Sequence, residues 1–343
     1  MIRFSRDIGI DLGTTSVLVY LDSKGIVINE PSAVALDKVT GKVLAVGSAA
    51  KKMLGRTPGN IVAARPLKNG AISDYDMTAA MLSEYLKRIT RLSLVKPRVI
   101  VSVPSGITEV EERAVIQAAM EAGARRVYLI EEPLAAALGA GMDIRGAGGS
   151  MAIDIGGGTT DIAVLSLNNV VKSTSIDTAG DAFDDAIIQY IRERYQVLIG
   201  SQTAEEVKMA IGCVNPRPEP LAMTVKGRNL STGLPQEVDV TSVDVMHALT
   251  TPCRDILYAV RSLLEKTEPE LVADISRNGI MLTGGGSLLY GFDQLIYRST
   301  GIMCHVADDA ILCVALGCGK SLKWIDQMQE GTINLARKKL MAE

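Results

Sequence analysis

Hydrophobic positions along the chain fall into short runs that suit β-strands, and the segments between them follow a pattern that occurs twice. The aliphatic run 8–12 leads into a turn of glycine and threonine and then into a second aliphatic run, and the run 152–155 begins the same series. Two apolar runs separated by such a turn predict a β-hairpin. Each predicted hairpin has an acidic residue at the end of its first strand, Asp11 in one and Asp154 in the other.

A second matched pair consists of a strand, a glycine-containing loop and a helix. The run 98–103 is followed by a Pro-Ser-Gly loop, after which Thr108 and Glu111 are spaced as a capping box that begins a helix. The run 280–283 leads into a loop of three glycines and a serine, and then into a predicted helix through Leu295. The same features therefore occur in the same order in both parts of the chain.

The third matched pair is a strand, two acidic residues and a helix that ends in closely spaced glycines. The strand 128–130 precedes Glu131 and Glu132, and the strand 303–306 precedes two aspartates. Three matches in one order make chance similarity an unsatisfactory explanation. They predict two similar α/β halves that meet near residues 146–149, with a cleft between the halves.

Two insertions distinguish the halves. Residues 32–65 in the first contain short strand-like runs, and residues 182–245 in the second are larger. In the second insertion, apolar residues recur at helical spacing from position 183, and Thr203 with Glu206 predicts another capping box. Each half should therefore carry a small subdomain on a larger one. The segments that look like a hairpin in this insertion are 221–228 and 237–241.

Composition agrees with a two-part globular protein and excludes several other classes. The chain has 343 residues, of which 47% are hydrophobic and 22% charged, so neither a single small module nor a disordered chain is expected. Lys and Arg total 36 against 39 Asp and Glu, and the formal net charge of -3 gives no general field to attract nucleic acid. The 32 glycines indicate many tight turns or close backbone approaches.

Cysteine usage and the apolar runs favour a cytosolic location. The odd number of cysteines without C-x-x-C spacing predicts buried, reduced thiols rather than a disulfide framework. Cys304 beside His305 could suggest a nucleophile, but adjacent residues of a strand point to opposite faces. The N-terminal residues have no apolar signal core, and no apolar run is long enough for a membrane span. The cysteines are Cys213, Cys253, Cys304, Cys313 and Cys318.

The two hairpin turns combine the groups that bind phosphate. Glycine lets backbone N–H groups approach an anion closely, and threonine hydroxyls add further donors. Two such turns could hold a polyphosphate from both sides. Asp11 and Asp154 at the strand ends could then bind hydrated Mg²⁺, because carboxylates beside phosphate repel it unless a cation intervenes. The alternative for either turn alone is an ordinary tight hairpin.

These motifs resemble those of the actin, sugar kinase and seventy-kilodalton heat-shock chaperone superfamily, and within it the MreB/Mbl family of bacterial actins. The resemblance extends from about residue 7 to residue 322. It implies an α/β fold of the duplicated RNase H-like (actin-like ATPase) type, with two halves around a nucleotide cleft and a smaller subdomain inserted in each. It also implies binding of ATP and Mg²⁺, and assembly of a homopolymer. The most similar stretches are 24–32, 54–61, 103–111, 130–133 and 282–287.

The resemblance assigns nucleotide contacts to specific positions. Asp11 and Asp154 would hold Mg²⁺ through water. The first phosphate motif comprises Gly13, Thr14, Thr15 and Ser16, and the second comprises Gly156, Gly157, Gly158, Thr159 and Thr160. The adenosine motif comprises Gly284, Gly285, Gly286 and Ser287, and the segment that reaches the nucleoside contains Glu205, Glu206 and Lys208. For Glu205 and Lys208, a surface ion pair on one helical face is the alternative.

Hydrolysis requires a water in line with the γ-phosphate and a group that orients it. Glu132 matches the superfamily's water-positioning acid and Thr159 matches its hydroxyl partner, whereas Glu131 should be structural. The alternative for Glu132 is a carboxylate favoured by the positive end of a helix. The sequence departs from the family pattern at Thr15 and Ser16, where Ala-Asn is usual, and at Asp161, where Glu is usual. These departures leave the paralogue and the turnover rate open.

The resemblance also predicts a division into four subdomains. Residues 1–31, 66–146 and 313–343 would form subdomain IA, and residues 32–65 subdomain IB. Residues 147–181 and 246–312 would form subdomain IIA, and residues 182–245 subdomain IIB.

Apolar residues beside cations suggest attachment to the inner face of the cytoplasmic membrane. Met1, Ile2 and Phe4 are interleaved with arginines, and Leu94 and Val95 precede a lysine in a predicted loop. The alternative is a core segment or a frayed end. Together with the resemblance, this predicts a peripheral membrane filament that maintains rod shape by organising cell-wall synthesis with cell-wall elongation proteins, and that hydrolyses ATP slowly.

Two other functions occur in the superfamily, those of a chaperone and of a sugar kinase. A chaperone needs a separate substrate domain, and only about twenty residues follow Ser321. A sugar kinase needs an acid placed as a base for a hydroxyl and a sugar pocket, and no motif marks either. We therefore expect a filament protein, with a chaperone-like or sugar-kinase-like ATPase as the alternative.

Overall fold

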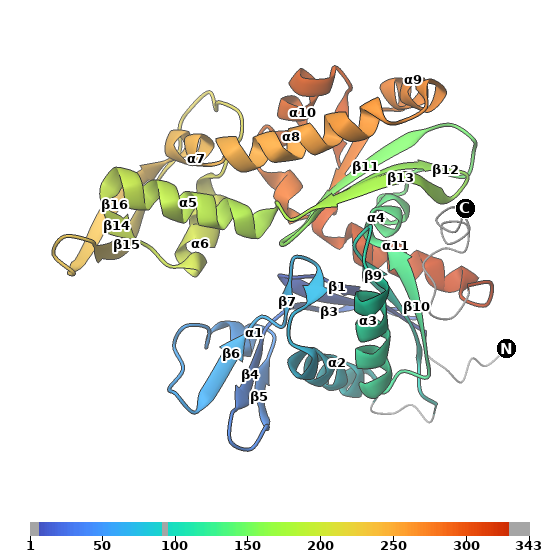
Figure 1. Ribbon diagram of the computed structural model, residues 1–343, viewed down its shortest axis with the longest axis horizontal. Coiled ribbons are helices and arrows are strands. Elements are labelled where there is room, and N and C mark those ends of the chain that lie inside the picture. Colours follow the sequence, from blue (N-terminus) through green and yellow to red (C-terminus); the bar gives the residue numbers. More distant parts are fainter. Residues whose placement is uncertain (1–6, 91–94, 329–343) are drawn as a thin grey trace. The chain divides into compact units, whose positions relative to one another are not determined.

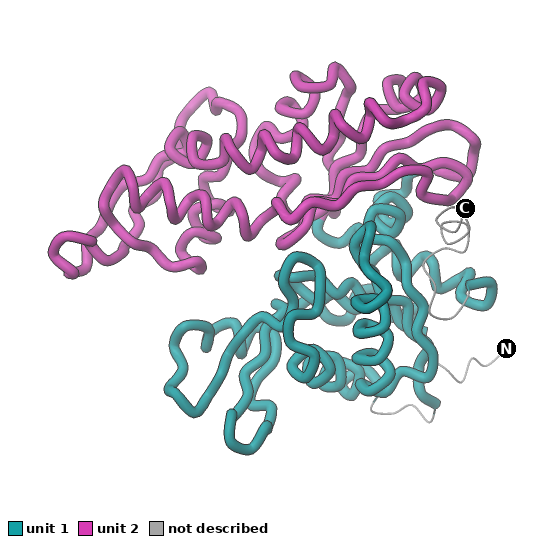
Figure 2. The backbone as a smooth tube through the Cα atoms, in the orientation of Figure 1, with its two compact units in different colours: residues 1–143, 311–343 teal, residues 144–310 magenta. Residues whose placement is uncertain are grey.

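The computed structural model describes residues 7–90 and 95–328, and the chain divides into two compact units. Unit 1 comprises Met1–Asp143 and Ile311–Glu343, and unit 2 comprises Ile144–Ala310 (Figure 2). Each unit is built on a five-stranded sheet with helices on its faces (Figure 1). The helices thus cover apolar strands that would otherwise be exposed to water.

The main sheet of unit 1 has the strand order β10-β9-β1-β2-β3. The first three strands of the chain pair antiparallel, and β9 and β10 join β1 in parallel. Alternate residues of β9 and β10 enter two separate apolar cores, one shared with α2 and α3 and the other with α4 and α11. The bounds are β1 Ile8–Leu12, β2 Ser16–Leu21, β3 Gly25–Pro31, β9 Arg98–Val103, β10 Arg126–Glu131, α2 Tyr75–Thr90, α3 Glu109–Glu121, α4 Glu132–Gly139, α11 Cys313–Ser321 and η3 Leu322–Trp324.

A small sheet of order β5-β4-β6 and a two-stranded ribbon complete the described part of unit 1. The small sheet lies within the first predicted insertion and packs its alanines against a short helix. The bounds are β4 Val34–Asp37, β5 Val43–Val46, β6 Ile61–Ala64, α1 Ser48–Lys51, β7 Leu67–Lys68 and β8 Ala71–Ile72.

Unit 2 repeats the architecture of unit 1. Its main sheet has the order β13-β12-β11-β17-β18, with antiparallel pairs for β11/β12 and β12/β13 and parallel pairs for β11/β17 and β17/β18. This is the order and direction of the sheet of unit 1, so the predicted internal duplication is confirmed. The bounds are β11 Ser150–Ile155, β12 Thr160–Ser166, β13 Asn169–Ile176, β17 Ile280–Thr283, β18 Cys304–Val306, α8 Thr250–Glu265, α9 Pro269–Asn278, η1 Gly285–Leu288, α10 Phe292–Thr300 and η2 Ala310–Leu312.

The second insertion contains helices and a small sheet of order β14-β15-β16. The hairpin predicted at 221–228 and 237–241 is confirmed, because β15 and β16 pair antiparallel there. The bounds are α5 Gly180–Tyr195, β14 Val197–Leu198, α6 Ser201–Ile211, β15 Ala222–Asn229, β16 Pro235–Thr241 and α7 Ser242–Ala248.

Capping boxes were predicted at the starts of two helices, and the structure contains one of them. The capping box of Thr108 and Glu111 at the start of α3 is confirmed, with both reciprocal hydrogen bonds present. The capping box of Thr203 and Glu206 is wrong, because α6 begins at Ser201 after Gly200 and has no side-chain cap. Small polar residues favour a helix start wherever they occur, so the spacing alone misplaced the N-cap by three residues, at Thr203 instead of Gly200.

The helix predicted through Leu295 is also placed wrongly. The glycine loop forms the short 3₁₀ turn η1, and a separate helix α10 begins at Phe292 and ends at Thr300. Gly291 separates them with φ 81°, a left-handed conformation that glycine adopts without strain and that interrupts a helix.

Glycines let α4 and α11 of unit 1 pack closely. A Cβ atom on Gly139 would lie 1.8 Å from the carbonyl oxygen of Cys313, and one on Gly317 would lie 1.8 Å from that of Ala135. No side chain fits at such distances, so these two glycines determine how near the helices approach. Gly139 is the last residue of α4, whereas Gly317 lies inside α11, so the helix end predicted at Gly317 is wrong and both glycines have a packing role.

All five cysteines are buried thiols, as expected from the sequence. Burial raises the pKa of Cys304 to about 12, which argues against a nucleophilic role for it. Among the described residues, no helix combines the length and the apolar character that crossing a bilayer requires.

Candidate functional site

The first predicted phosphate turn joins β1 to β2 and is anchored on both sides. Within the turn, the amide of Gly13 donates to the carbonyl of Ser16 at 3.0 Å. The hydroxyl of Thr14 accepts a hydrogen bond from the amide of Gly70 at 2.9 Å, and Thr14 is buried. A Cβ on Gly13 would lie 2.9 Å from the carbonyl oxygen of Ser16, so glycine is required for this tight turn. Thr15 is also held, because its carbonyl accepts from the amide of Ser32 at 2.9 Å.

Asp11 and Glu132 are the two predicted acids of unit 1. Asp11, near the end of β1, accepts a hydrogen bond from the hydroxyl of Ser102 on β9 at 3.2 Å. Glu132 is the first residue of α4 and is only 7% exposed. Burial raises the pKa of Cys318 well above its usual value, and the charges of Asp11 and Glu132 raise this pKa further. Both predicted acids of the unit thus act on the same buried thiol of α11.

Glu131 makes a different contact from its neighbour. It is buried at the end of β10 and accepts a hydrogen bond from the hydroxyl of Ser105 at 2.9 Å. Ser105 belongs to the loop after β9, so Glu131 connects the ends of two parallel strands.

The second phosphate turn joins β11 to β12 and packs on the start of α5. The amide of Gly156 donates to the carbonyl of Thr159 at 2.9 Å, which repeats the closing hydrogen bond of the first turn. The amide of Gly180 donates to the carbonyl of Gly156 at 3.1 Å, and that of Asp181 donates to Gly157 at 2.7 Å. The turn is therefore fixed to the N-terminus of a helix, a position that favours anions.

The strands that flank this turn carry a buried carboxylate. Asp154 accepts a hydrogen bond from the hydroxyl of Thr283 on β17 at 2.6 Å. Burial raises the pKa of Asp154 to about 6, although the Thr283 hydrogen bond lowers it. On the next strand, the hydroxyl of Thr160 donates to the carbonyl of Thr178 at 2.6 Å. Asp154 is thus a carboxylate that a nearby cation would stabilise strongly.

The predicted adenosine loop lies directly against the end of β11. Gly284 has φ 78°, and a Cβ there would lie 2.3 Å from the carbonyl oxygen of Ile155. A Cβ on Gly286 would lie 2.3 Å from Cγ2 of Ile155, so both glycines are required for this approach. The hydroxyl of Ser287 donates to the carbonyl of Gly284 at 2.7 Å and closes the loop. The structure therefore brings this loop and the second phosphate turn together within unit 2.

Lys208 reaches the same place from α6. Its ammonium group donates to the carbonyl of Gly180 at 2.9 Å and forms an ion pair with Asp184 at 2.9 Å. Burial raises the pKa of Asp184 to about 6, although Lys208 lowers it. Glu205 is half-buried, and Glu206 is exposed and accepts from Gln202 at 3.3 Å.

Asp184 was not predicted from the sequence, although a signal for it exists. It lies among the apolar residues Phe183, Ile187 and Ile191, which recur at helical spacing and form the buried face of α5. A charged residue on a buried helical face needs a partner of opposite charge. The spacing of Glu205 and Lys208 on α6 predicts a pair within one helix, whereas the partner of Lys208 in the structure is Asp184 on α5.

The donor atoms present suit Mg²⁺ held mainly by phosphate and water. The carboxylates of Asp11 and Asp154 and the surrounding hydroxyls are oxygen donors, the type that Mg²⁺ prefers. Within residues 7–90 and 95–328, no three His, Cys, Asp or Glu side chains gather to hold a metal ion. As oxygen donors, the carboxylates of Asp11 and Asp154 would suit hydrated Mg²⁺, each holding it through water.

Most of the predicted membrane contacts lie outside the described residues. This holds for Met1, Ile2, Phe4 and Leu94. Val95 is described, and it is half-buried at the start of the segment that leads into β9.

Sequence comparison matches nearly the whole chain to a known family. A family model described as "MreB/Mbl protein" matches residues 5–330. The chain is 50% identical over 329 residues to the cell shape-determining protein MreB of Escherichia coli strain K12, covering 94% of this chain and 95% of that one. It is 48% identical over 326 residues to the cell shape-determining protein Mbl of Bacillus subtilis strain 168, covering 95% and 98%.

Structure comparison gives the same result for the fold. MreB5 of Spiroplasma citri bound to ADP matches with a TM-score of 0.90 and 39% identity, covering 94% of this chain and 98% of that chain. A MamK double helical filament matches with a TM-score of 0.78 at 22% identity, covering 93% and 99%, and shares the fold. The duplicated actin-like fold expected from the resemblance is confirmed, and the four-subdomain division stays a prediction.

Proposed function

Because the chain belongs to the MreB/Mbl protein family, we propose that it is an ATP-binding, actin-like filament protein that maintains cell shape. The observation that carries this proposal is the repeated glycine turn. In both units a β-hairpin closes through the same amide-to-carbonyl hydrogen bond, between Gly13 and Ser16 and between Gly156 and Thr159. In both, an aspartate near the end of the first strand accepts a hydroxyl hydrogen bond from the neighbouring parallel strand.

ATP and Mg²⁺ are the proposed ligands of these turns. The backbone amides and the hydroxyls of Thr14, Thr15 and Ser16 in one turn, and of Thr159 in the other, would bind phosphate oxygens. Thr160, whose hydroxyl already donates to the carbonyl of Thr178, would hold the end of the second turn in place. The loop that begins at Gly284 would accept the adenosine, since its glycines leave the backbone accessible. The solved structure of MreB5 bound to ADP supports a nucleotide of this class. Bound Mg²⁺ would neutralise charge on the phosphates beside Asp11 and Asp154.

We propose that Glu132 and Thr159 support slow hydrolysis of ATP to ADP and phosphate. Glu132 is rigidly placed as the first residue of α4, with Pro133 after it, and is almost fully buried. A carboxylate so placed can orient a water and accept its proton. The proposed water-orienting acid and the proposed Mg²⁺ ligand both belong to unit 1, and the charges of both raise the pKa of Cys318.

The assembly proposed for the chain is a homopolymer of protofilaments, peripheral on the inner face of the cytoplasmic membrane. Its partners would be cell-wall elongation proteins. Weak attachment by each subunit, through Met1, Ile2, Phe4, Leu94 and Val95, would be summed along the filament. The names of the relatives, both cell shape-determining proteins, support the cellular role.

Sedimentation with Mg-ATP and anionic lipid vesicles tests the proposal. We expect the full chain to pellet only above a threshold concentration with Mg-ATP, and to float with vesicles in a density gradient. A chain that stays monomeric with ATP under all conditions would overturn the filament function. If sugars or unfolded polypeptides accelerated its ATP turnover, a kinase or chaperone role would replace it.

A variant that lacks residues 1–6 and carries Leu94→Ser and Val95→Ser tests the membrane contact separately. We expect it to pellet with Mg-ATP like the unaltered chain and to lose flotation with vesicles. Flotation that persists would show that the membrane contact lies elsewhere on the chain.

A further inference from the structure

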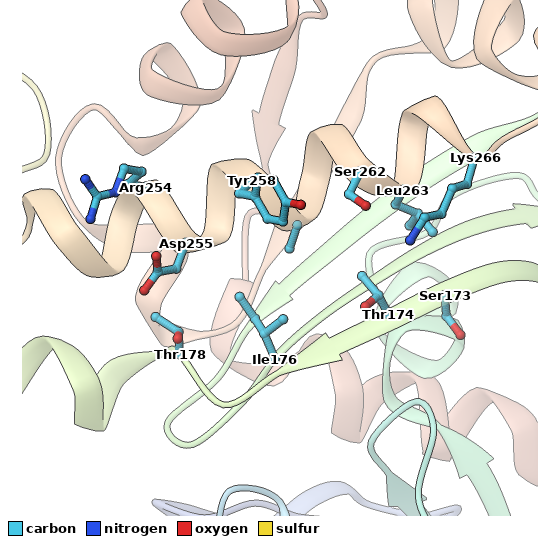
Figure 3. Close-up of a pocket in the computed structure, with 11 residues that line it drawn as sticks. Ser173, Thr174, Ile176, Thr178, Arg254, Asp255, Tyr258, Ser262, Leu263 and Lys266 are labelled. Carbon is cyan, nitrogen blue, oxygen red and sulfur yellow. The ribbon is translucent and has the colours of Figure 1, made fainter.

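A groove of about 650 Å³ runs between β13 and α8 in unit 2, apart from the glycine turns. Its wall on the strand side includes Thr174, Ile176 and Thr178, alternate residues of β13 and its extension. Figure 3 shows Thr174 and Ile176 projecting from the strand toward the helix. The helix side is a stripe at intervals of four residues, made of Arg254, Tyr258, Ser262 and Lys266.

The strand that forms this wall is the last strand of its sheet. The order β13-β12-β11-β17-β18 leaves one side of β13 without a strand partner in the part of the chain that the structure describes. Edge strands present a ladder of backbone groups that another extended chain can join. Lysine often protects such edges, but Lys172 here turns to the end of α8, where it contacts the carbonyl of Lys266 and pairs with Glu268 at 3.0 Å.

The two walls have the same length. The stripe from Arg254 to Lys266 spans about 18 Å at 1.5 Å per helical residue. The strand side from Ser173 to Thr178 spans about 17 Å at 3.3 Å per residue. An extended segment of about six residues therefore fits along the groove with its ends beside the two cations.

We propose that β13 and α8 form a docking groove for an extended peptide of a partner protein that carries an acidic side chain. The peptide joins the sheet beside β13, and its alternate side chains enter the space beneath α8. Ala259 and Leu263 of α8 are buried and apolar, and they would contact one of these peptide side chains. Arg254 and Lys266 are both exposed, and one of them pairs with the acidic side chain.

The charges favour a partner protein over a second copy of this strand. Arg254, Asp255 and Lys266 give the lining a net positive charge. Strand β13 has the sequence NVVKSTSI, which contains a lysine and no acidic residue. Pairing β13 with β13 of another copy would therefore supply no carboxylate to either end of the groove.

A displayed library of random heptapeptides, selected on the full chain, provides the probe. We expect enriched peptides that combine β-branched residues with Asp or Glu, and a labelled synthetic peptide from this set to bind measurably in fluorescence anisotropy. Ser262→Tyr fills the groove and should raise its Kd at least tenfold, and Lys266→Glu should raise it similarly. Arg261→Glu makes the same charge change on α8 away from the groove lining and should change the Kd less than twofold.

Hydrogen exchange distinguishes the mode of binding. Added peptide should slow exchange of the backbone amides of residues 173–178, whereas the variants should keep the melting temperature and nucleotide affinity of the unaltered chain. The proposal is overturned if no peptide is enriched, if Ser262→Tyr leaves binding unchanged, or if the peptide binds as a helix. Protection of residues 173–178 that rises with protein concentration, without peptide, would assign the edge to self-pairing instead.

Discussion

The buried carboxylate of Asp154, a proposed ligand of hydrated Mg²⁺, should make the nucleotide-free protein less stable. Burial raises its pKa from 3.8 to about 6, so the folded chain opposes ionisation of this group. Asp154→Asn removes the charge and keeps an oxygen that can accept the hydrogen bond of Thr283. The nucleotide-free variant should therefore be more stable than the unaltered chain at neutral pH.

The pKa shift of Asp154 gives the magnitude and the sign. At 1.36 kcal/mol per pKa unit, the rise corresponds to about 3 kcal/mol, an upper estimate because local relaxation reduces it. Because the folded pKa is raised, the unaltered chain has its full stability below pH 3.8, where Asp154 is protonated. It loses this stability as the pH rises through about 6 and the buried carboxyl ionises. The advantage of Asp154→Asn should therefore grow from near zero at pH 4 to its full value above pH 6.5.

Thermal unfolding without nucleotide, in EDTA, measures this effect across that pH range. At about 2.1 cal/mol/K per residue for the entropy of unfolding, 3 kcal/mol corresponds to a rise in Tm of about 4 °C for a chain of this length unfolding as one unit. The matched control is Asp239→Asn, because Asp239 also accepts a threonine hydroxyl at 2.6 Å, from Thr224, but is exposed. We expect the control to stay within about 0.5 kcal/mol of the unaltered chain.

Added Mg-ATP should reverse the order of the two proteins. A ligand at a thousandfold excess over its Kd stabilises a protein by about 4.1 kcal/mol, which exceeds the advantage of the variant, and this gain should be close to zero in Asp154→Asn. A Tm of nucleotide-free Asp154→Asn that is below that of the unaltered chain at pH 7.5 would refute the reasoning. A gain of equal size at pH 4 and pH 7.5 would refute it as well.

Three further predictions concern other parts of the site and the fold. Glu132→Ala should keep its affinity for ATP and lose at least tenfold in phosphate release; unchanged release would remove this acid from the proposed hydrolysis. Lys208→Met should weaken ATP binding at least tenfold in calorimetry and destabilise the chain, because it leaves Asp184 buried without its cation. Adding Asp184→Asn should restore the stability but not the affinity, and recovery of both would show that the pair has only a structural role. Gly317→Ala should cost about 3 kcal/mol or more in urea unfolding, whereas Gly200→Ala, with no atom within 4 Å of the added Cβ, should cost less than about 1 kcal/mol.

The duplicated sheets could be predicted because their signals are local in the sequence. A hairpin needs two apolar runs and a turn, so the elements around Asp11 and Asp154 were found by pattern alone. The order of the matched segments then implied that the parallel strands join in the same way twice. The capping box at Thr108 was also found, because all its atoms lie within four residues.

The contacts that hold the site together depend on residues far apart in the chain. The amide of Gly70 donates to the hydroxyl of Thr14 across 56 positions, and Thr283 reaches Asp154 across 129. No pattern within a single element specifies either pair. The capping box predicted at Thr203 is wrong although its signal is local. Thr203 and Glu206 have the correct spacing, but the backbone is already helical at Ser201.

Asp184 and Asp154 show why such contacts matter for function. Both are buried carboxylates whose pKa burial raises to about 6, and both lie beside elements of the second phosphate turn. A core selected for stability alone would replace them with apolar residues, since buried charges are expensive even when paired. Asp184 fixes Lys208 against the carbonyl of Gly180, at the place where α5 meets the turn. Asp154 lies where a cation that accompanies phosphate would relieve its burial. If the chain binds a metal nucleotide as proposed, the cation would offset the burial of Asp154, and folding of this region would be coupled to the ligand.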